Sequence, residues 1–415
     1  MNLFRKIILS VSVGWAALVL AEQAPVTLEP LIEEALKNNP EIRALSADIT
    51  AARGEVTTAR TWQNPELAVA PGVVHERAAG TGFHGNFEFG QTIEFPGKRA
   101  LRRAVAEKNV EARELALAGF RFQLTIQVRR AFYSILAAQQ VVALKEQQLA
   151  LAKSFAEAAT KKVEGGFAPD FEATKAQVEV VAAQRTVREA QAQVATARAA
   201  LNALLGRKPS EPLAVAGELG FGVTLPDEAT LLAQALARNP SLKVQATEVE
   251  RTGLNLRSVR KSRLPDFTVG PNLEYRKDEQ IFGLGVSLPV PLWDRKKGAI
   301  ATATAEQQKA LAEFDKLQQE ILRDVSSAAQ RLNAAKESLG YYTPALREKV
   351  KAALDAASQS YREGRTTLLI FLETQRTYFD TQADYFETLQ KLYDAQAELE
   401  AALGMPLIES QENTR

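Results

Sequence analysis

The sequence predicts a mainly α-helical protein with a small β part, in which long antiparallel coiled-coil helices and four strands form two tandem repeats. Three observations predict this fold class. Residues 98–163 contain no proline and only one glycine, Gly119, which allows a helix of about 100 Å. Pairs of segments with alternating apolar residues separate the helical stretches. The whole pattern then recurs about 200 residues later.

The composition excludes several kinds of site. The chain has 415 residues and a formal net charge of +1, so no charge excess points to nucleic acid as a partner. Aromatic residues make up only 7% of the chain, whereas alanine and leucine dominate, as in coiled-coil proteins. The absence of cysteine excludes disulfides, thiolate metal sites, a cysteine nucleophile and a lipid attached to cysteine.

Residues 1–21 read as a secretory signal peptide. Arg5 and Lys6 form its positive start, residues 7–20 form its apolar run, and residues 19–21 fit a cleavage site with small residues. A single membrane anchor is the alternative reading. The apolar run is too short for it, because a transmembrane helix needs about 20 residues.

The first repeat is expected over residues 22–206. It starts with a helix over about 31–61, which ends before Pro65 because the residue before a proline leaves helical space. A β-hairpin follows over 66–95, with a loop at 78–82. Pro96 and Gly97 turn the chain into the long helix 98–163, and a return helix over 170–205 follows the turn at Gly166.

Both long helical segments carry the heptad spacing of a coiled coil, so a second helix is expected alongside each. Lys145 is the one polar intrusion in the seam of the first segment. The seam of residues 98–163 consists of Val128, Ile135, Val142, Leu149 and Ala156 together with Ala131, Ala138, Ala152 and Ala159. The seam of residues 170–205 consists of Val180, Val187, Val194 and Leu201 together with Ala183, Ala190, Ala197 and Leu204.

The second repeat is expected over residues 229–404, after a connector over 207–228 with a possible short strand at 213–216. Residues 231–240 echo residues 31–40, and both segments end in Asn-Pro. The remaining parts are a hairpin over 266–290, a turn at Pro291, a long helix over 295–363 that is broken near 340–344, a return helix over 368–403 and a tail over 405–415.

In each repeat the two shorter helices together match the long helix in length, so we expect them to stack end to end against it. We expect the strands to place one end of this rod in a membrane, with a soluble sheet packed on a core as the alternative. Each has about ten residues and one apolar face, as in the wall of a transmembrane barrel. Four strands cannot close a barrel, and open edges do not occur in lipid, so the chain must associate with other copies.

The sequence resembles the TolC-type outer-membrane efflux proteins over nearly the whole mature chain. The resemblance rests on the hairpin exits and the glycine-led helix turns, namely Glu94-Phe95-Pro96-Gly97-Lys98-Arg99 and Pro289-Val290-Pro291-Leu292-Trp293-Asp294. The first of these, together with residues 168–176 (APDFEATKA), is similar to the heavy-metal, CzcC-like branch. Many relatives carry a lipidated cysteine, which this chain lacks.

The resemblance implies a homotrimer with a twelve-stranded barrel in outer-membrane lipid and a helical tunnel through the periplasm. It also implies a periplasmic adaptor protein and a proton-driven inner-membrane pump as partners. Such a channel is no enzyme and needs no cofactor.

The cargo of such a channel is not fixed by the sequence: divalent heavy-metal cations are favoured by the motifs, and drugs or organic solutes are the alternative. The alternative from a different functional class is a periplasmic coiled-coil scaffold, which would need no lipid-facing strands.

The resemblance places the tunnel entrance at the two helix turns. By this likeness the turns form a periplasmic tip that an adaptor grips, although C-cap glycines alone explain Gly166 and Gly364 equally well. The expected adaptor-contact residues are Gly166, Pro169, Asp170 and Gly364, and Pro169, Asp170 and Arg365 are expected to be exposed.

Acidic residues near these turns ring the entrance in the family and select for cations. Glu172 and Glu373 are the candidates here, with Arg362 and Arg365 as nearby opposite charges. Ile370 occupies a second position that is acidic in relatives, which argues against a double acidic ring. Ordinary solvated carboxylates are the alternative.

His75 and His84 are the two histidines of the chain, and both fall in or beside the first hairpin. Such a pair is more often a surface feature than a metal site, so no resident metal is expected. The sequence contains no nucleophile triad, no phosphate-binding loop and no clustered metal ligands.

Overall fold

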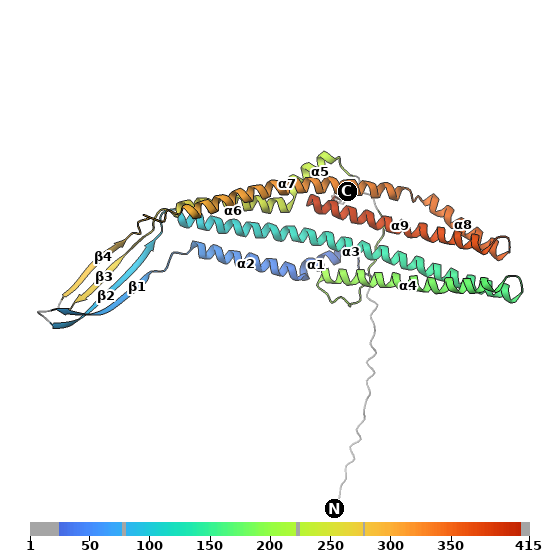
Figure 1. Cartoon of the computed structure of the whole chain (residues 1–415), viewed down its shortest axis with the longest axis horizontal. Helices are drawn as coiled ribbons and strands as arrows, with labels where there is room; N and C mark the ends of the chain where they lie inside the picture. Colours follow the sequence, from blue (N-terminus) through green and yellow to red (C-terminus); the bar gives the residue numbers. More distant parts are fainter. Residues whose placement is uncertain (1–24, 77–79, 221–224, 277–278, 408–415) are drawn as a thin grey trace, which may run out of the picture.

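The computed structural model describes residues 25–76, 80–220, 225–276 and 279–407. The expected signal peptide, residues 1–21, and the last part of the expected tail lie outside these ranges. The described residues form an elongated rod, with a small sheet at one end and two helical hairpins at the other (Figure 1). Among the helices described, none has a stretch both long and apolar enough to cross a membrane.

The structure places one uninterrupted helix, α3 (Lys98–Glu164), along the rod. Helices α2 (Pro40–Arg60), α1 (Leu28–Asn38) and α4 (Asp170–Leu205) follow it on one side (Figure 1). The expected single helix over 31–61 is therefore wrong in one respect. The chain breaks at Asn39, because Pro40 cannot continue a helix and Asn39 adopts φ −59° and ψ 127° before it.

The second repeat has the same order of elements. Helices α5 (Glu228–Arg238) and α6 (Pro240–Lys261) break at Asn239 in the same way. Helix α7 (Lys297–Gly340) is followed by α8 (Pro344–Arg362), and α9 (Leu368–Leu403) returns beside both (Figure 1). The α7–α8 break falls in the expected region, where Thr343 caps α8 by accepting a 3.2 Å hydrogen bond from the amide of Leu346.

The two hairpins join into one antiparallel sheet in the order β1 (Glu66–Glu76), β2 (Gly80–Ile93), β3 (Phe267–Arg276) and β4 (Glu279–Ser287). Two expectations about the hairpins are wrong. Strand β2 already begins at Gly80, so the loop is shorter than 78–82. Strand β4 ends at Ser287 instead of residue 290, because the prolines at 289 and 291 have no N–H to donate to a ladder.

Where a short strand was expected at 213–216, the described part of the connector forms one parallel bridge, between Val215 and Val26. The core consists of three clusters along the rod. One lies among α1–α4, one among α5, α6, α7 and α9, and the third near the helical tip. The whole of the α4 a-position row, Val180, Val187, Val194 and Leu201, is buried, as a coiled-coil seam requires.

Candidate functional site

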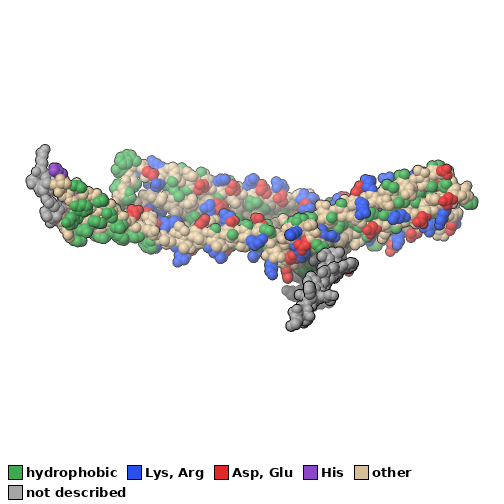
Figure 2. Space-filling view, turned by 90° about the horizontal axis from the view of Figure 1, so that it is seen from below, with side chains coloured by type: hydrophobic (Ala, Val, Ile, Leu, Met, Phe, Trp, Pro, Cys, Tyr) green, Lys and Arg blue, Asp and Glu red, His purple; other side chains and the backbone are tan. Residues whose placement is uncertain are grey.

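One face of the sheet is mainly apolar across all four strands, interrupted by His75, Thr81, Gln91 and Gln280, and we call it the apolar wall. Residues paired across neighbouring strands point to the same face, so the register shows which side chains share it. Leu67, Phe282 and Leu284 are 70–76% exposed although they are large and apolar. Figure 2 shows hydrophobic side chains concentrated over this end of the rod. The wall contains Leu67, Val69, Val73, Phe83, Phe87, Phe89, Ile93, Phe267, Val269, Leu273, Phe282, Leu284 and Val286.

The opposite face of the sheet carries polar and small side chains. Glu88 is opposite Asn272, and Asn86 is opposite Glu274, so carboxylates and amides alternate along the two central strands. A sheet with one apolar and one polar face matches a barrel wall that separates lipid from an aqueous lumen.

The structure does not bring the two histidines into one site. His84 lies on the polar face, where its Nδ1 is 4.0 Å from the Oε1 of Glu274. His75 lies on the other face, where its Nδ1 is 2.7 Å from the Oγ1 of its register partner Thr81. Over the described residues, no group of three or more His, Cys, Asp or Glu side chains is placed to hold a metal ion.

The turn between sheet and rod is fixed by two carboxylates. Asp266 accepts hydrogen bonds from the amide of Phe95 at 2.7 Å and from Lys98 Nζ at 2.8 Å, so it ties the two repeats together. Glu94 is buried and accepts a 2.6 Å bond from Arg102. Gly97 adopts φ +88°, a conformation that a side chain would strain, which explains the Pro96-Gly97 turn. Pro291, in the second exit, follows the end of β4 and is exposed.

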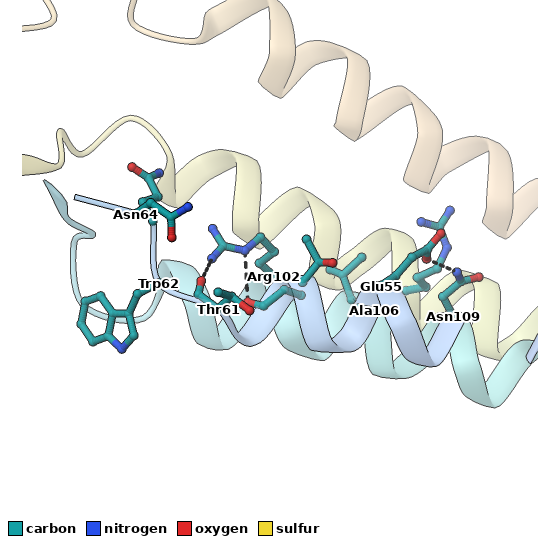
Figure 3. Close-up of a pocket in the computed structure, with 12 residues that line it drawn as sticks. Glu55, Thr61, Trp62, Asn64, Arg102, Ala106 and Asn109 are labelled. Carbon is teal, nitrogen blue, oxygen red and sulfur yellow. Dashed lines mark hydrogen bonds between the residues drawn. The ribbon is translucent and has the colours of Figure 1, made fainter. Parts of the chain in front are cut away.

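Below this turn, a cavity of about 800 Å³ lies among α2, α3 and α6. Figure 3 shows Trp62 at one end of it and Glu55 with Asn109 at the other, where Asn109 Nδ2 donates to Glu55 Oε2 at 2.8 Å. Arg102 lines the middle of the cavity and donates to the carbonyls of Ala59 and Thr61. These contacts hold the end of α2 against α3, which gives the cavity a structural role at the base of the sheet.

Two turns of the same conformation form the far end of the rod. Gly166 and Gly364 both adopt φ +73°. Phe167 donates its amide to the carbonyl of Lys162 at 2.8 Å, and Arg365 donates to Ser360 at 2.8 Å. These are Schellman turns, which explain both glycines by helix termination alone. Pro169 and Asp170, at the start of α4, are exposed as expected.

Aromatic side chains join the two helical hairpins just behind these turns. The ring of Phe155, on α3, is stacked on that of Phe371, on α9, at 4.7 Å and lies 4.9 Å from that of Tyr361, on α8. Lys162 donates to the carbonyl of Tyr361 at 2.6 Å, and its Nζ lies 3.9 Å from the centroid of that ring. Together these contacts hold the α3–α4 hairpin against the α8–α9 hairpin.

Glu172 is part of this contact. Its Oε2 accepts a 3.1 Å hydrogen bond from the hydroxyl of Tyr361, and the side chain is half-buried. Burial of Tyr361, reinforced by the negative charge of Glu172, raises the pKa of the Tyr361 hydroxyl to about 12. The hydroxyl therefore remains a hydrogen-bond donor throughout the neutral range.

The other expected entrance residues lie apart from this contact. Glu373 is exposed on the first turns of α9, and its neighbours Leu369 and Ile370 are 65% and 52% exposed. Arg362 is also exposed. Arg365 forms an ion pair with Glu363, within its own turn, and not with either candidate acid.

The sequence pattern missed the aromatic cluster of Phe155, Tyr361 and Phe371 and its partner Lys162. Aromatic residues are scarce in this chain, so three of them near the same pair of turns are a usable signal. The pairing of Tyr361 with Glu172 could not be found in this way, because it joins residues that are far apart in the sequence.

Comparisons with known proteins agree on one family. Residues 31–207 and 231–405 each match the family model described as outer membrane efflux protein. The chain is 28% identical to the cobalt-zinc-cadmium resistance protein CzcC of Cupriavidus metallidurans, over 92% of this chain and 90% of that relative. It is 27% identical to the nickel-cobalt-cadmium resistance protein NccC of Alcaligenes xylosoxydans xylosoxydans, over 76% of this chain and 71% of that relative.

Solved structures support the same fold. A membrane protein from Pseudomonas aeruginosa superposes with a TM-score of 0.79 at 18% identity, covering 94% of this chain and 92% of that one. The transmembrane channel protein CusC superposes with a TM-score of 0.77 at 18% identity, covering 91% of this chain and 92% of that one. Both likenesses span nearly the full length of this chain.

Proposed function

Because the chain belongs to the outer membrane efflux protein family, we propose that it is the outer-membrane duct of a three-part export system and that its cargo is divalent heavy-metal cations. Proteins of this family are channels of the outer membrane. The observation that carries the proposal is the position of the apolar wall at one end of a helical rod. This arrangement fits a duct that is fixed in lipid at one end and reaches into the periplasm with the other.

The open sheet edges support a homotrimer. Strands β1 and β4 have neighbours on one side only in the single chain, and unpaired backbone groups are not tolerated in lipid. Three copies would supply a closed barrel of twelve strands. Chemical cross-linking in detergent should give a trimer, and a ladder that stops at the dimer would contradict this part of the proposal.

The helical turns support contact with an adaptor protein. Phe167 is 85% exposed beside Gly166, and Leu369 and Ile370 are exposed on the paired hairpin. Apolar side chains exposed at the end of a rod favour a protein partner at that position. In the proposed system this partner is a periplasmic adaptor that couples the duct to a proton-driven inner-membrane pump.

The metal cargo is supported by the relatives and by the polar face of the sheet. Relatives named for cobalt, zinc, cadmium and nickel resistance match most of the chain. Glu88 and Glu274 lie on the polar face, where a carboxylate favours the passage of cations. Organic solutes remain a second candidate, because a pyoverdine export protein of Pseudomonas putida is 22% identical over 91% of this chain.

Deletion of the gene, with complementation, tests the cargo. Loss of the duct should increase sensitivity to cobalt, zinc and cadmium salts more than sensitivity to hydrophobic antibiotics. The reverse profile would replace the metal cargo with an organic one and leave the duct intact. Cell fractionation tests the location separately. If this protein is absent from the outer-membrane fraction, a periplasmic scaffold would be favoured, although a scaffold does not account for the apolar wall.

A further inference from the structure

A second cleft, of about 630 Å³, lies where β2 passes into α3. Its lining includes Ile93 at the base of β2, a residue of the apolar wall that is opposite Phe267. Arg60 at the end of α2 and Arg99 and Arg103 in the first turns of α3 line the same cleft. The cleft is thus continuous with the lipid-facing side of the sheet and carries positive charge directly beneath it.

The positive charge of this cleft is poorly neutralised by the chain itself. Within the described ranges, Arg60 and Arg99 form no ion pair. Arg103 pairs with Glu107 at 2.7 Å, but both side chains are about half exposed, so the pair is weak. Glu94, the acidic residue of the lining, is buried, and its carboxylate already forms an ion pair with Arg102. The free charges therefore favour an anionic ligand.

The side chain of Trp62 also lines the cleft and gives it an aromatic side. Trp62 is 52% exposed, and the Cζ of Arg99 lies 4.0 Å from the centroid of its ring. Tryptophan is enriched where the hydrocarbon of a membrane meets its headgroups. The exit of the second hairpin has a similar composition, because Trp293 is 92% exposed and Arg295, Lys296 and Lys297 come soon after it, although Lys296 is paired with the intervening Asp294.

We propose that the cleft binds the headgroup of an anionic phospholipid from the periplasmic leaflet of the outer membrane. The acyl chains would lie on the apolar wall above Ile93, while the phosphate contacts Arg60, Arg99 and Arg103. Arginine suits this role because its planar group donates two hydrogen bonds to one phosphate. A free phosphate ion would gain nothing from Ile93 and Trp62. The proposal rests on the outer-membrane position of the sheet and is independent of the cargo.

Fluorescence from Trp62 tests the site directly. The chain contains three tryptophans, and Trp15 lies in the expected signal peptide, so replacing Trp293 by phenylalanine leaves Trp62 as the single reporter in the mature protein. The purified protein is placed in nanodiscs of phosphatidylcholine and phosphatidylglycerol in equal parts, with bromine on the acyl chains of one lipid or the other. Stronger quenching by brominated phosphatidylglycerol is expected, because the anionic lipid is enriched beside the ring.

The triple variant Arg60→Gln/Arg99→Gln/Arg103→Gln should remove most of this preference, because each basic group near an anionic surface changes binding by about fivefold. The triple lysine variant keeps the charge but loses the paired hydrogen bonds, so it should retain part of the preference, more than the glutamine variant does. A matched control, Arg185→Gln/Arg188→Gln/Arg376→Gln, removes three exposed arginines from the rod and should leave it unchanged. Equal quenching by both lipids in the parent, or an unchanged preference in the first variant, would overturn the proposal.

Salt dependence provides a test that needs no arginine variant. Because the arginines are accessible, the preference for phosphatidylglycerol should decline as salt rises and screens them. A preference that does not change with salt would exclude these charges as its cause, even if the glutamine variant fails to insert. All of these measurements concern lipid binding, so a failed metal-export assay would leave their outcome intact.

Discussion

The side-chain amide of Asn39 donates a 2.9 Å hydrogen bond to the backbone carbonyl of Leu204 and thereby joins α2 to the end of α4. Asn239 does the same in the second repeat, where its amide donates to the carbonyl of Ala402 at 2.9 Å. Each asparagine also caps the helix that follows it, since its Oδ1 accepts from the backbone amide two residues later. The Asn-Pro pairs are therefore joints between stacked helices.

The first prediction concerns these joints. Asn39→Ala removes both the cap of α2 and the bond to Leu204, which should cost about 1–2 kcal/mol locally. Amide hydrogen exchange in the first turn of α2 should accelerate, as followed by mass spectrometry. The adjacent Asn38→Ala is the matched control, because Asn38 is exposed. Equal exchange in the two variants would show that Asn39 does not hold the joint.

The second prediction concerns the apolar wall. Leu284→Arg places a charge on the lipid-facing side of β4 and should cost about 2–4 kcal/mol near the middle of the membrane. The amount of folded protein recovered in outer-membrane fractions should fall. Ala70→Arg places the same charge on the polar face of β1 and should be tolerated. Equal recovery of both variants would argue against lipid on the wall.

The third prediction concerns the contact between the helical hairpins at the tip. Tyr361→Phe keeps the ring stacking but loses the hydrogen bond to Glu172, so single-channel conductance in a planar bilayer should rise slightly. Tyr361→Ala also removes the ring, a loss of about 3–5 kcal/mol of packing, and should raise conductance further. Tyr341→Ala, at an exposed site near the α7–α8 break, is the control. The same conductance in all three variants would exclude this contact from closure.

The fourth prediction concerns pH. Tyr361 has a folded-state pKa of about 12 against an ordinary value of 10.0, so its contribution to stability is complete below pH 10. Between pH 10 and 12 the unfolded form ionises first, and the closed tip loses that stabilisation as pH rises. Conductance should remain flat through neutral pH and begin to rise above pH 10. Tyr361→Phe should abolish the rise; if it persists, another group such as Tyr393 is responsible.

The architecture was predictable because its signals are periodic and long. The alternation of apolar residues in the hairpins places one set of side chains on one face, and the register of the structure does the same. The recurrence of Asn-Pro and of the glycine turns indicated two repeats. The break at Asn39 was missed because the flanking helical pattern continues through it. Only the pairing of Asn39 with Leu204 shows why the break is maintained.

The contacts at the tip were less predictable. The sequence pointed to Glu172 and Glu373 as equivalent carboxylates, because both follow a glycine turn. The structure separates them, since Glu172 is half-buried against Tyr361 and Glu373 is exposed. The difference arises because the face of α4 that carries Glu172 packs against the other hairpin. Which face does so depends on contacts between α4 and α8, and the residue spacing within either helix does not reveal those contacts.

The last prediction follows from this separation. If the proposed entrance selects for cations, an exposed carboxylate will attract them more than one that is engaged in a hydrogen bond. Glu373→Gln should therefore lower the cation-to-anion permeability ratio more than Glu172→Gln does, and the loss should shrink at high salt. Arg365→Gln should have a smaller effect, because Arg365 is paired with Glu363 in its own turn. Reversal potentials across a salt gradient give the ratios, and an unchanged ratio in the Glu172→Gln/Glu373→Gln double variant would place both carboxylates away from the path.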